Sequence, residues 1–312
     1  MLPLIHGHRG ARGRRPENTL AAVAYALESG VDGIEIDVCV SRDNIVVVHH
    51  DLHVSGKTAK DACGNWLTQT VPVRDLDFDE LKTLDVGSLN PNSDYALSFK
   101  QQTGIPGERI PSLTEFISFV VARSGDCVLN VELKGSPDTG NLVPDVVDYV
   151  TAVIGELLRF DIINRTFLQS FDWRLVAEAK RQCPGLKTGL LTDLQPDGDP
   201  RTPVSGQPNG WTAGLDLAHF NHSVVEMISE FGADVWSCNF RDISPELIHD
   251  ARKRDLEVYV WTANEPEDIN RMLDWGVDVI TTDYPDRCRQ LRDERRQSVT
   301  KPPPSTCGRY SL

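Results

Sequence analysis

The sequence has no long run of apolar residues. The longest stretch, from 116 to 122, is interrupted by Ser118, whereas a helix that crosses a bilayer needs ~18 or more such residues. The opening segment MLPLIHGHRG also lacks the basic and apolar regions of a secretory signal. We therefore expect a protein with no membrane span that works in the cytosol.

Cysteine is sparse and carries no recognisable pattern. The chain has 7 cysteines, none in a CxxC pair. An odd number scattered through a chain this long does not indicate a disulfide framework. We interpret these residues as small buried apolar side chains, with Cys307 a free thiol in a loose C-terminal tail.

Positive charge is also in deficit. The 32 basic residues face 46 acidic ones, which gives a formal net charge of −14. Proteins that bind nucleic acid rely on basic surfaces, so this balance argues against such a partner. The same field repels anionic small molecules. An anionic substrate would therefore need local positive charge or a metal ion in its pocket.

The residues that are present alternate between strand-like and helix-like segments. Within 312 residues, of which 40% are hydrophobic, short runs rich in Val and Ile alternate with stretches of helical spacing, a pattern typical of parallel β/α units. Eight strands are predicted near 3–8, 33–40, 127–133, 165–170, 187–192, 234–238, 257–262 and 278–282. Eight helices are predicted near 18–30, 113–124, 142–159, 172–183, 222–231, 244–254, 266–274 and 284–296. Eight such units predict an α/β fold of the closed TIM-type (β/α)8 barrel kind.

Two segments interrupt this alternation. Residues 51–112 contain turn residues and no strong period, and they are too long for an ordinary loop, so we interpret them as an insertion after the second strand region. The loop 193–221 is rich in Gly, Pro and Asp. Both would border the C-terminal face of a barrel, where active sites are built. We predict one domain over 1–296 and a disordered tail over 297–312.

Carboxylates alternate with apolar residues in one predicted strand. In Gly33-Ile-Glu-Ile-Asp-Val, Glu35 and Asp37 share one face. Alone, this pattern is more typical of an edge strand with an acidic side in water. Inside a barrel, two close carboxylates need a cation. Glu132 and Lys134 repeat the spacing on the third strand, where Lys134 is either a salt-bridge partner or a phosphate contact. Oxygen ligands favour Mg²⁺ or Ca²⁺.

Histidines occur in doublets at two further positions. His6 and His8 end the first strand, and His49 and His50 follow the run Ile45-Val-Val-Val. Imidazole suits proton transfer near neutral pH, so one histidine of each doublet is a candidate acid or base. Arg9 offers a guanidinium fork for a phosphate oxygen.

Later strand ends carry weaker signals. Gln169 is a candidate substrate contact, and Trp261 is either core packing or an apolar wall for a substrate. Asp283 is interpreted as a cap of the last helix.

Taken together, these motifs resemble the glycerophosphodiester phosphodiesterase family. The segments that match its pattern are His8-Arg9-Gly10, Pro16-Glu17-Asn18-Thr19, Glu35-Ile36-Asp37, His50-Asp51, Glu132-Leu133-Lys134, Gln169-Ser170-Phe171-Asp172, Trp261-Thr262-Ala263-Asn264 and Gly276-Val277-Asp278 through Asp283-Tyr284-Pro285. They span roughly residues 4–290 in the family's order.

The resemblance implies a phosphoric diester hydrolase on a TIM-type barrel that converts glycerophosphodiesters to glycerol 3-phosphate and an alcohol. It implies one divalent cation, Mg²⁺ or Ca²⁺, held by Glu35, Asp37 and Glu132. It selects His8 and His50 as the acid/base pair and places Arg9 and Lys134 near the phosphate.

Two other functions fit parts of the pattern. Lysophospholipase D or sphingomyelinase-D-like enzymes share the barrel, the paired histidines and the three carboxylates, but insertion 51–112 is less like theirs. A non-catalytic binder of phosphorylated ligands is the other alternative, although such proteins usually lose a catalytic histidine or a metal ligand. The run after His50-Asp51 also departs from the common family pattern, and this bears on the substrate rather than on the chemistry.

Overall fold

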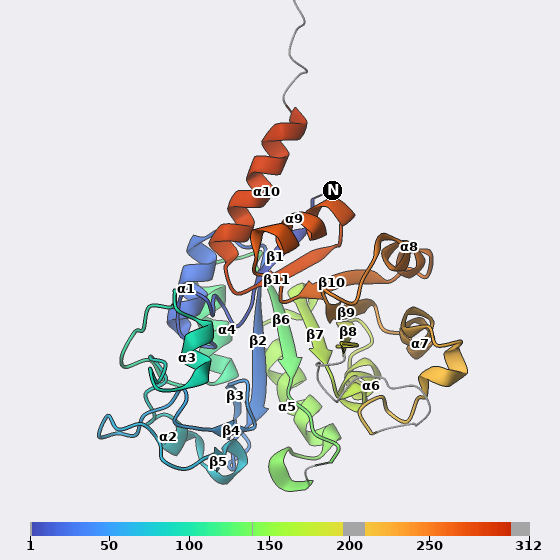
Figure 1. Cartoon of the computed structure of the whole chain (residues 1–312). Helices are drawn as coiled ribbons and strands as arrows, with labels where there is room; N and C mark the ends of the chain where they lie inside the picture. Colours follow the sequence, from blue (N-terminus) through green and yellow to red (C-terminus); the bar gives the residue numbers. More distant parts are fainter. Residues whose placement is uncertain (1, 139, 196–209, 301–312) are drawn as a thin grey trace, which may run out of the picture.

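A closed barrel of parallel strands forms the centre of the protein (Figure 1). The computed structural model describes residues 2–138, 140–195 and 210–300. The barrel strands are β1 (Leu4–Gly7), β2 (Gly33–Val40), β6 (Val128–Leu133), β7 (Thr166–Ser170), β8 (Lys187–Thr192), β9 (Val235–Asn239), β10 (Glu257–Trp261) and β11 (Val279–Thr282). Each pairs in parallel with the next, and β1 closes the ring by pairing with both β11 and β2. The predicted barrel and its eight strands are confirmed.

Helices surround the barrel between successive strands. They are α1 (Leu20–Glu28), α4 (Leu113–Val121), α5 (Val146–Arg159), α6 (Trp173–Gln182), α7 (Val224–Phe231), α8 (Pro245–Lys253), α9 (Pro266–Trp275) and α10 (Pro285–Thr300), with short 3₁₀ turns η2 (Gly140–Leu142), η3 (Ile163–Arg165) and η4 (Leu217–Phe220). The predicted starts of four helices are confirmed, because Thr19, Ser112, Asp172 and Ser244 accept backbone N–H groups of the first turn.

The main apolar core lies between the strands and the helices. On β2, Ile34, Ile36 and Val38 are fully buried members of this core. Successive side chains of a strand point to opposite faces, so Glu35 and Asp37 point into the barrel. The helices that bury one face of β2 therefore determine that its carboxylates lie in the interior.

The insertion begins where the chain leaves the barrel after β3 (Val46–Val48), which pairs antiparallel with β2. It contains β4 (His53–Val54) and β5 (Val71–Pro72), the 3₁₀ turn η1 (Val73–Asp75), and the short helices α2 (Phe78–Leu81) and α3 (Asp94–Ser98). A second apolar cluster fills it and includes Cys39 and Val47 of the barrel edge. The insertion is thus packed onto the β2–β3 edge rather than extended from it.

The C-terminal helix is longer than predicted. α10 continues to Thr300, so the helix expected near 284–296 takes in the first residues of the predicted tail 297–312. The rest of that tail, with Cys307, lies outside the described residues, as do 196–209 of the loop predicted over 193–221. In the described part of the chain, no helix combines the length and the apolar character needed to cross a membrane.

Candidate active site

Three carboxylates meet inside the barrel near the C-terminal ends of two neighbouring strands. Asp37 of β2 is in register with Glu132 of β6, and Glu35 precedes Asp37 on the same face. One oxygen from each residue lies within 4.8 Å of the others, and all three side chains are buried. The group could hold a metal ion, because a set of carboxylate oxygens matches the preference of hard divalent cations.

The electrostatics of this triad suit a bound cation. Burial raises the pKa of Glu35 well above its usual range, and the charges of Asp37 and Glu132 act in the same direction. The Oδ1 atom of Asp37 is buried and has no hydrogen-bond partner among the described residues. A divalent cation would relieve the repulsion and satisfy this oxygen at once.

Two side chains hold the triad in place. Lys134 Nζ lies 2.5 Å from Glu132 Oε1 and 3.4 Å from Asp37 Oδ1, so the predicted salt bridge is present and extends to a second carboxylate. Asn18 donates from Nδ2 to Asp37 Oδ2 at 2.9 Å. Burial opposes ionisation of Asp37, but the charges of His50, Arg9 and Lys134 outweigh it and hold its pKa well below the usual range.

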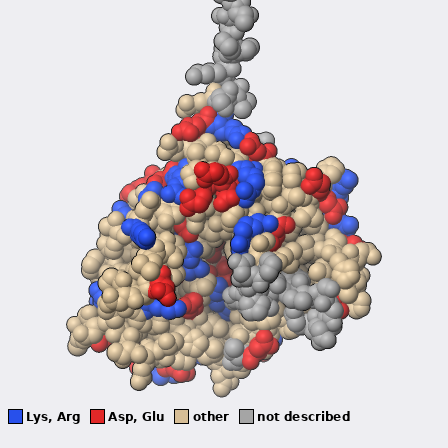
Figure 2. All heavy atoms as spheres, in the orientation of Figure 1, with Lys and Arg blue, Asp and Glu red and all other residues tan. Residues whose placement is uncertain are grey.

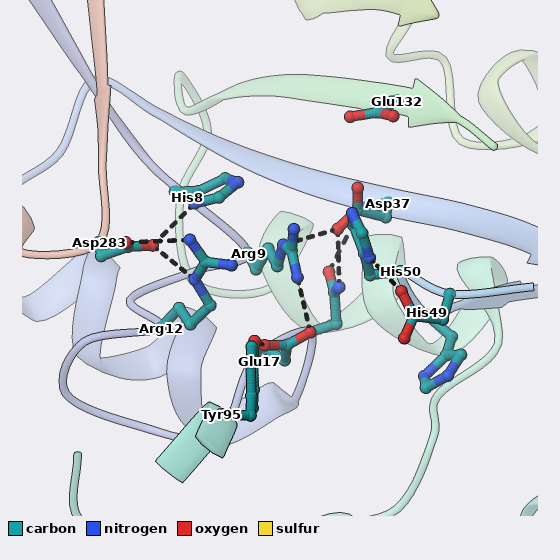
Figure 3. Close-up of polar contacts among 12 residues, drawn as sticks. His8, Arg9, Arg12, Glu17, Asp37, His49, His50, Tyr95, Glu132 and Asp283 are labelled. Carbon is teal, nitrogen blue, oxygen red and sulfur yellow. Dashed lines mark hydrogen bonds and ion pairs between the residues drawn. The ribbon is translucent and has the colours of Figure 1, made fainter. Parts of the chain in front are cut away.

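His8 is fixed by a buried carboxylate from the other end of the chain. Its Nδ1 lies 2.7 Å from Asp283 Oδ1 (Figure 3). Asp283 also accepts from Arg12 Nε at 2.8 Å and from Asn264 Nδ2 at 2.7 Å. With Nδ1–H donated to Asp283, the lone pair of His8 Nε2 is left on the side of Glu35, whose Oε2 is 3.8 Å away.

The environment keeps this histidine neutral and the aspartate charged. Burial lowers the pKa of His8 to about 4, and the Arg12 cation contributes in the same direction. Burial alone would raise the pKa of Asp283, but Arg12 and His8 outweigh it and hold the value far below the usual range. The interpretation of Asp283 as a helix cap is therefore wrong, because its carboxylate contacts His8, Arg12 and Asn264 rather than the first turn of α10, which begins at Pro285.

His50 lines the same cavity as His8 and is partly exposed. It follows β3, and its Nδ1 lies 2.6 Å from Asp51 Oδ1. A quarter of the His50 side chain is exposed, and Asp51 is mostly exposed. Burial of the ring and the nearby cations Arg9 and Lys134 lower the pKa of His50. Both predicted histidines are thus paired with an aspartate, one deep in the barrel and one at its mouth.

Arg9 and Gly10 form a sharp turn directly after His8. Arg9 has φ of 50° and Gly10 of 82°, a region that favours glycine. This turn lets the Arg9 N–H donate to Glu35 Oε2 at 2.8 Å. The Arg9 guanidinium contacts Glu17 Oε1 at 2.8 Å and Asp37 Oδ2 at 3.2 Å. A side chain at position 10 would meet Ala22 at 2.8 Å, so this turn requires glycine.

These groups surround a single cavity of about 250 Å³. Its charged and imidazole lining residues are His8, Arg9, Arg12, Glu35, His50, Glu132, Lys134 and Asp193, and its other lining residues are Gln169, Phe171, Leu191, Trp261, Thr262 and Thr281. On the face of the molecule drawn in Figure 2, basic and acidic side chains are interspersed rather than separated by sign. The cavity itself is lined by the cations Arg9, Arg12 and Lys134 beside the carboxylates Glu35, Glu132 and Asp193.

The structure brings together the candidate residues selected from the sequence. Eight of the nine line the cavity, and the ninth, Asp37, lies against Glu35 and Glu132. The structure also distinguishes the two histidines within each doublet. His6 is buried deeper in the barrel against Tyr259, with a ring-centroid distance of 5.8 Å. His49 turns away, and its Nε2 lies 3.2 Å from the His53 carbonyl oxygen.

Sequence reasoning missed three functional neighbours. Arg12 holds Asp283, and Glu17 holds Arg9. Tyr95 of the insertion donates its hydroxyl to Glu17. The first two belong to the charged run that follows β1, which was a usable signal. Tyr95 lies in a segment without periodicity, and nothing in the local sequence marks it.

The fold and site define a TIM-type barrel with an acidic triad and two His–Asp pairs. Residues 8–287 match the glycerophosphoryl diester phosphodiesterase family, and the chain belongs to that family. It is 30% identical to a glycerophosphodiester phosphodiesterase from Bacillus altitudinis over 94% of this chain and 99% of the relative. An enzyme of the same name from Caldanaerobacter subterraneus is 29% identical, with 92% and 96% covered.

Solved structures agree with this assignment. The crystal structure of a Silicibacter pomeroyi protein that bears the family's name matches with a TM-score of 0.84 and 33% identity, over 94% of each chain. A phosphodiesterase from Oleispira antarctica, solved with its product sn-glycerol-3-phosphate, matches with a TM-score of 0.66 and 23% identity, over 94% of this chain and 97% of that one. The second match shows the fold alone.

Proposed function

We propose that the protein hydrolyses glycerophosphodiesters to sn-glycerol 3-phosphate and an alcohol. The observation that carries this proposal is that His8, His50 and the carboxylate triad meet at one cavity. A phosphodiester anion repels a nucleophile, so its hydrolysis needs charge neutralisation, a base and an acid. The cavity offers groups for all three.

We infer that Glu35, Asp37 and Glu132 hold one divalent cation, Mg²⁺ or Ca²⁺. Support comes from the oxygen-only donor set, the buried Asp37 Oδ1 atom that has no hydrogen bond among the described residues, and the raised pKa of Glu35. When bound, the cation would stabilise charge on the phosphoryl oxygens. Lys134 and Asn18 keep the ligand side chains oriented for it.

His8 and His50 divide the proton transfers. One removes a proton from the attacking oxygen, either of water or of the glycerol hydroxyl, as the new P–O bond forms. The other must carry a proton on Nε2 as well, and it gives this proton to the leaving alkoxide as the old P–O bond breaks. Asp283 and Asp51 hold the two rings through Nδ1, which leaves each Nε2 for the transfer.

The rest of the cavity binds the substrate. The Arg9 guanidinium and the Lys134 ammonium line it and provide positive charge for the phosphate, although both also contact carboxylates. Gln169 lies across the cavity and accepts from Ser237 at 2.6 Å. Trp261 packs edge-to-face on Phe171 at 5.6 Å and gives the organic part of the substrate an apolar wall.

A substrate panel tests the proposed function. Purified protein is assayed for sn-glycerol 3-phosphate release from several glycerophosphodiesters, with Mg²⁺, with Ca²⁺ and with a chelator. We expect release that depends on the cation. Release from lysophospholipids or sphingomyelin alone would establish the lipid phosphodiesterase instead. Binding of glycerophosphodiesters without turnover under any condition would support the non-catalytic binder.

A further inference from the structure

Part of the insertion lies directly against the loop that carries His8 and Arg9. We call residues 8–17 the active-site loop and residues 94–103 the docking segment. The Thr103 N–H donates to the Arg14 carbonyl at 2.9 Å, and Gln102 Nε2 donates to the Arg12 carbonyl at 2.8 Å. The Arg14 guanidinium donates to Gln101 Oε1 at 2.6 Å. The two segments are thus joined along their length, although they lie far apart in the sequence.

Tyr95 of the docking segment reaches one of the active-site arginines through a carboxylate. Its hydroxyl donates to Glu17 Oε2, and Glu17 Oε1 accepts from Arg9 at 2.8 Å (Figure 3). Arg9 lines the substrate cavity and contacts Asp37. Both oxygens of Glu17 are therefore engaged, one by the insertion and one by the active site, so the position of the Tyr95 hydroxyl fixes the partner of Arg9.

Phe99 reaches the second arginine directly. The Arg12 guanidinium lies over the Phe99 ring, 4.6 Å from its centroid, and Phe99 is buried. Arg12 in turn donates twice to Asp283, which holds His8. The Tyr95 and Phe99 rings pack edge-to-face at 5.0 Å, so the two contacts form one unit.

We propose that Tyr95 and Phe99 are positioning residues, through which the insertion sets the orientation of Arg9, Arg12 and His8 in the cavity. Neither ring lines the cavity, so each acts through its arginine. The insertion is then part of the catalytic scaffold rather than a separate appendage. The kinetic part of this inference rests on the proposed function, whereas the structural part does not.

The kinetic test compares two variants of the Phe99 ring with one matched control variant. Phe99→Leu removes the aromatic face under Arg12, and Phe99→Trp restores one. Trp66→Leu is the control, because Lys60 Nζ lies 4.5 Å from the Trp66 ring in the same insertion. Small displacements of catalytic groups are costly, so we expect kcat to fall roughly tenfold in Phe99→Leu, with Phe99→Trp and Trp66→Leu close to wild type. Equal losses in all three, or none in Phe99→Leu, would overturn the proposal.

A double-mutant cycle tests the route through Glu17. Tyr95→Phe removes only the hydroxyl, and it is measured in the wild type and in Glu17→Gln. If Tyr95 acts through Glu17, its effect on kcat/KM shrinks toward none once Glu17 is changed. Independent effects that multiply would show that Tyr95 supports the fold without positioning Arg9. Melting temperatures are recorded for each variant so that a general loss of folding is recognised.

Hydrogen exchange tests the inference without turnover. The amides of Arg12, Gly13 and Arg14 are hydrogen-bonded to the carbonyls of His8, Asp283 and Ala11. We expect a peptide spanning 9–15 to exchange faster in Phe99→Leu than in wild type or Trp66→Leu. Unchanged exchange would contradict the docking role. A wild type that releases no glycerol phosphate would refute the proposed function and leave this readout intact.

Discussion

The Nδ1 atom of His8 lies 2.7 Å from the Oδ1 atom of Asp283, a residue 275 positions later in the chain. Closure of the barrel makes this contact, because β1 and β11 pair in register and both residues follow directly after their strands. Asp283 is fully buried and held by Arg12 and Asn264. The orientation of His8, and with it the acid/base role proposed for this residue, therefore depends on a residue of the last β/α unit.

Asp283→Asn is expected to lower kcat by about 10²-fold or more while the protein still folds. An amide at this position no longer stabilises the Nδ1–H form of His8 or the charge of Arg12, so Nε2 loses its fixed role. The control is Asp293→Asn, which removes an exposed pair with Arg289 on α10. Steady-state kinetics of both variants check this. An unchanged kcat in Asp283→Asn would show that the His8–Asp283 pair has no catalytic part.

Glu35→Gln is expected to abolish the stabilisation that Mg²⁺ or Ca²⁺ gives the wild type. A cation that binds only the folded state adds about 2.7 kcal/mol at a hundredfold excess over its Kd. Without cation the variant should melt higher than the wild type, because the repulsion among Glu35, Asp37 and Glu132 is reduced. Thermal unfolding with cation and with chelator measures both effects. A melting shift in Glu35→Gln equal to that of the wild type would argue against the triad as the cation site.

Gly10→Ala is expected to destabilise the protein more than Gly64→Ala. Both glycines have φ near 80°, at 82° and 84°, so each substitution costs roughly 1–2 kcal/mol from backbone strain. A side chain at position 10 also meets Ala22 at 2.8 Å, whereas position 64 has nothing within 4 Å. The difference between the free energies of unfolding of the two variants, measured with denaturant, gives the cost of the contact with Ala22. Equal losses would mean that the turn after His8 can shift away from α1.

His6→Leu is expected to stabilise the protein at pH 5. Burial lowers the pKa of His6 to about 4, against the opposing influence of Asp32, and neither ring nitrogen has a hydrogen-bond partner among the described residues. The unfolded chain takes up this proton below pH ~6.5 and the folded protein only near pH 4. The histidine therefore costs stability as pH falls through that window, on the order of 2 kcal/mol at pH 5.

The free energy of unfolding of the wild type and His6→Leu, measured at pH 5 and at pH 8, tests this prediction. The gain from His6→Leu should be larger at pH 5, and the control is His249→Leu at an exposed position of α8. A gain that is the same at both pH values would show that packing, and not protonation, sets the difference.

The barrel could be predicted from the sequence because its strands are short, rich in Val and Ile and separated by helical periods. The carboxylates were found for the same reason, since alternation along β2 and β6 places them on the face away from the apolar core. Period-2 alternation could not separate His6 from His8, because both point into the barrel and differ only in depth. The resemblance to the family selected His8, and the structure shows the difference in depth, because His6 lies within β1 in register with its neighbours whereas His8 follows the strand.

The supporting contacts were beyond sequence reasoning. The pair Arg12–Asp283 joins residues 271 positions apart, and Asp283 stands where a helix cap is expected. Tyr95 and Phe99 lie in a segment whose position is set by packing of the insertion against the barrel. Such contacts depend on chain closure and on docking of an irregular segment, which local patterns do not encode.

The most direct test of the central claim uses the adjacent histidines His49 and His50. Release of sn-glycerol 3-phosphate with saturating cation is measured for the wild type, His50→Ala, His49→Ala and His8→Ala. Loss of an acid or base costs about 10²–10⁴-fold, so we predict losses of that size for His8→Ala and His50→Ala and near wild-type turnover for His49→Ala. Near wild-type turnover in His50→Ala, or an equal loss in His49→Ala, would contradict the account.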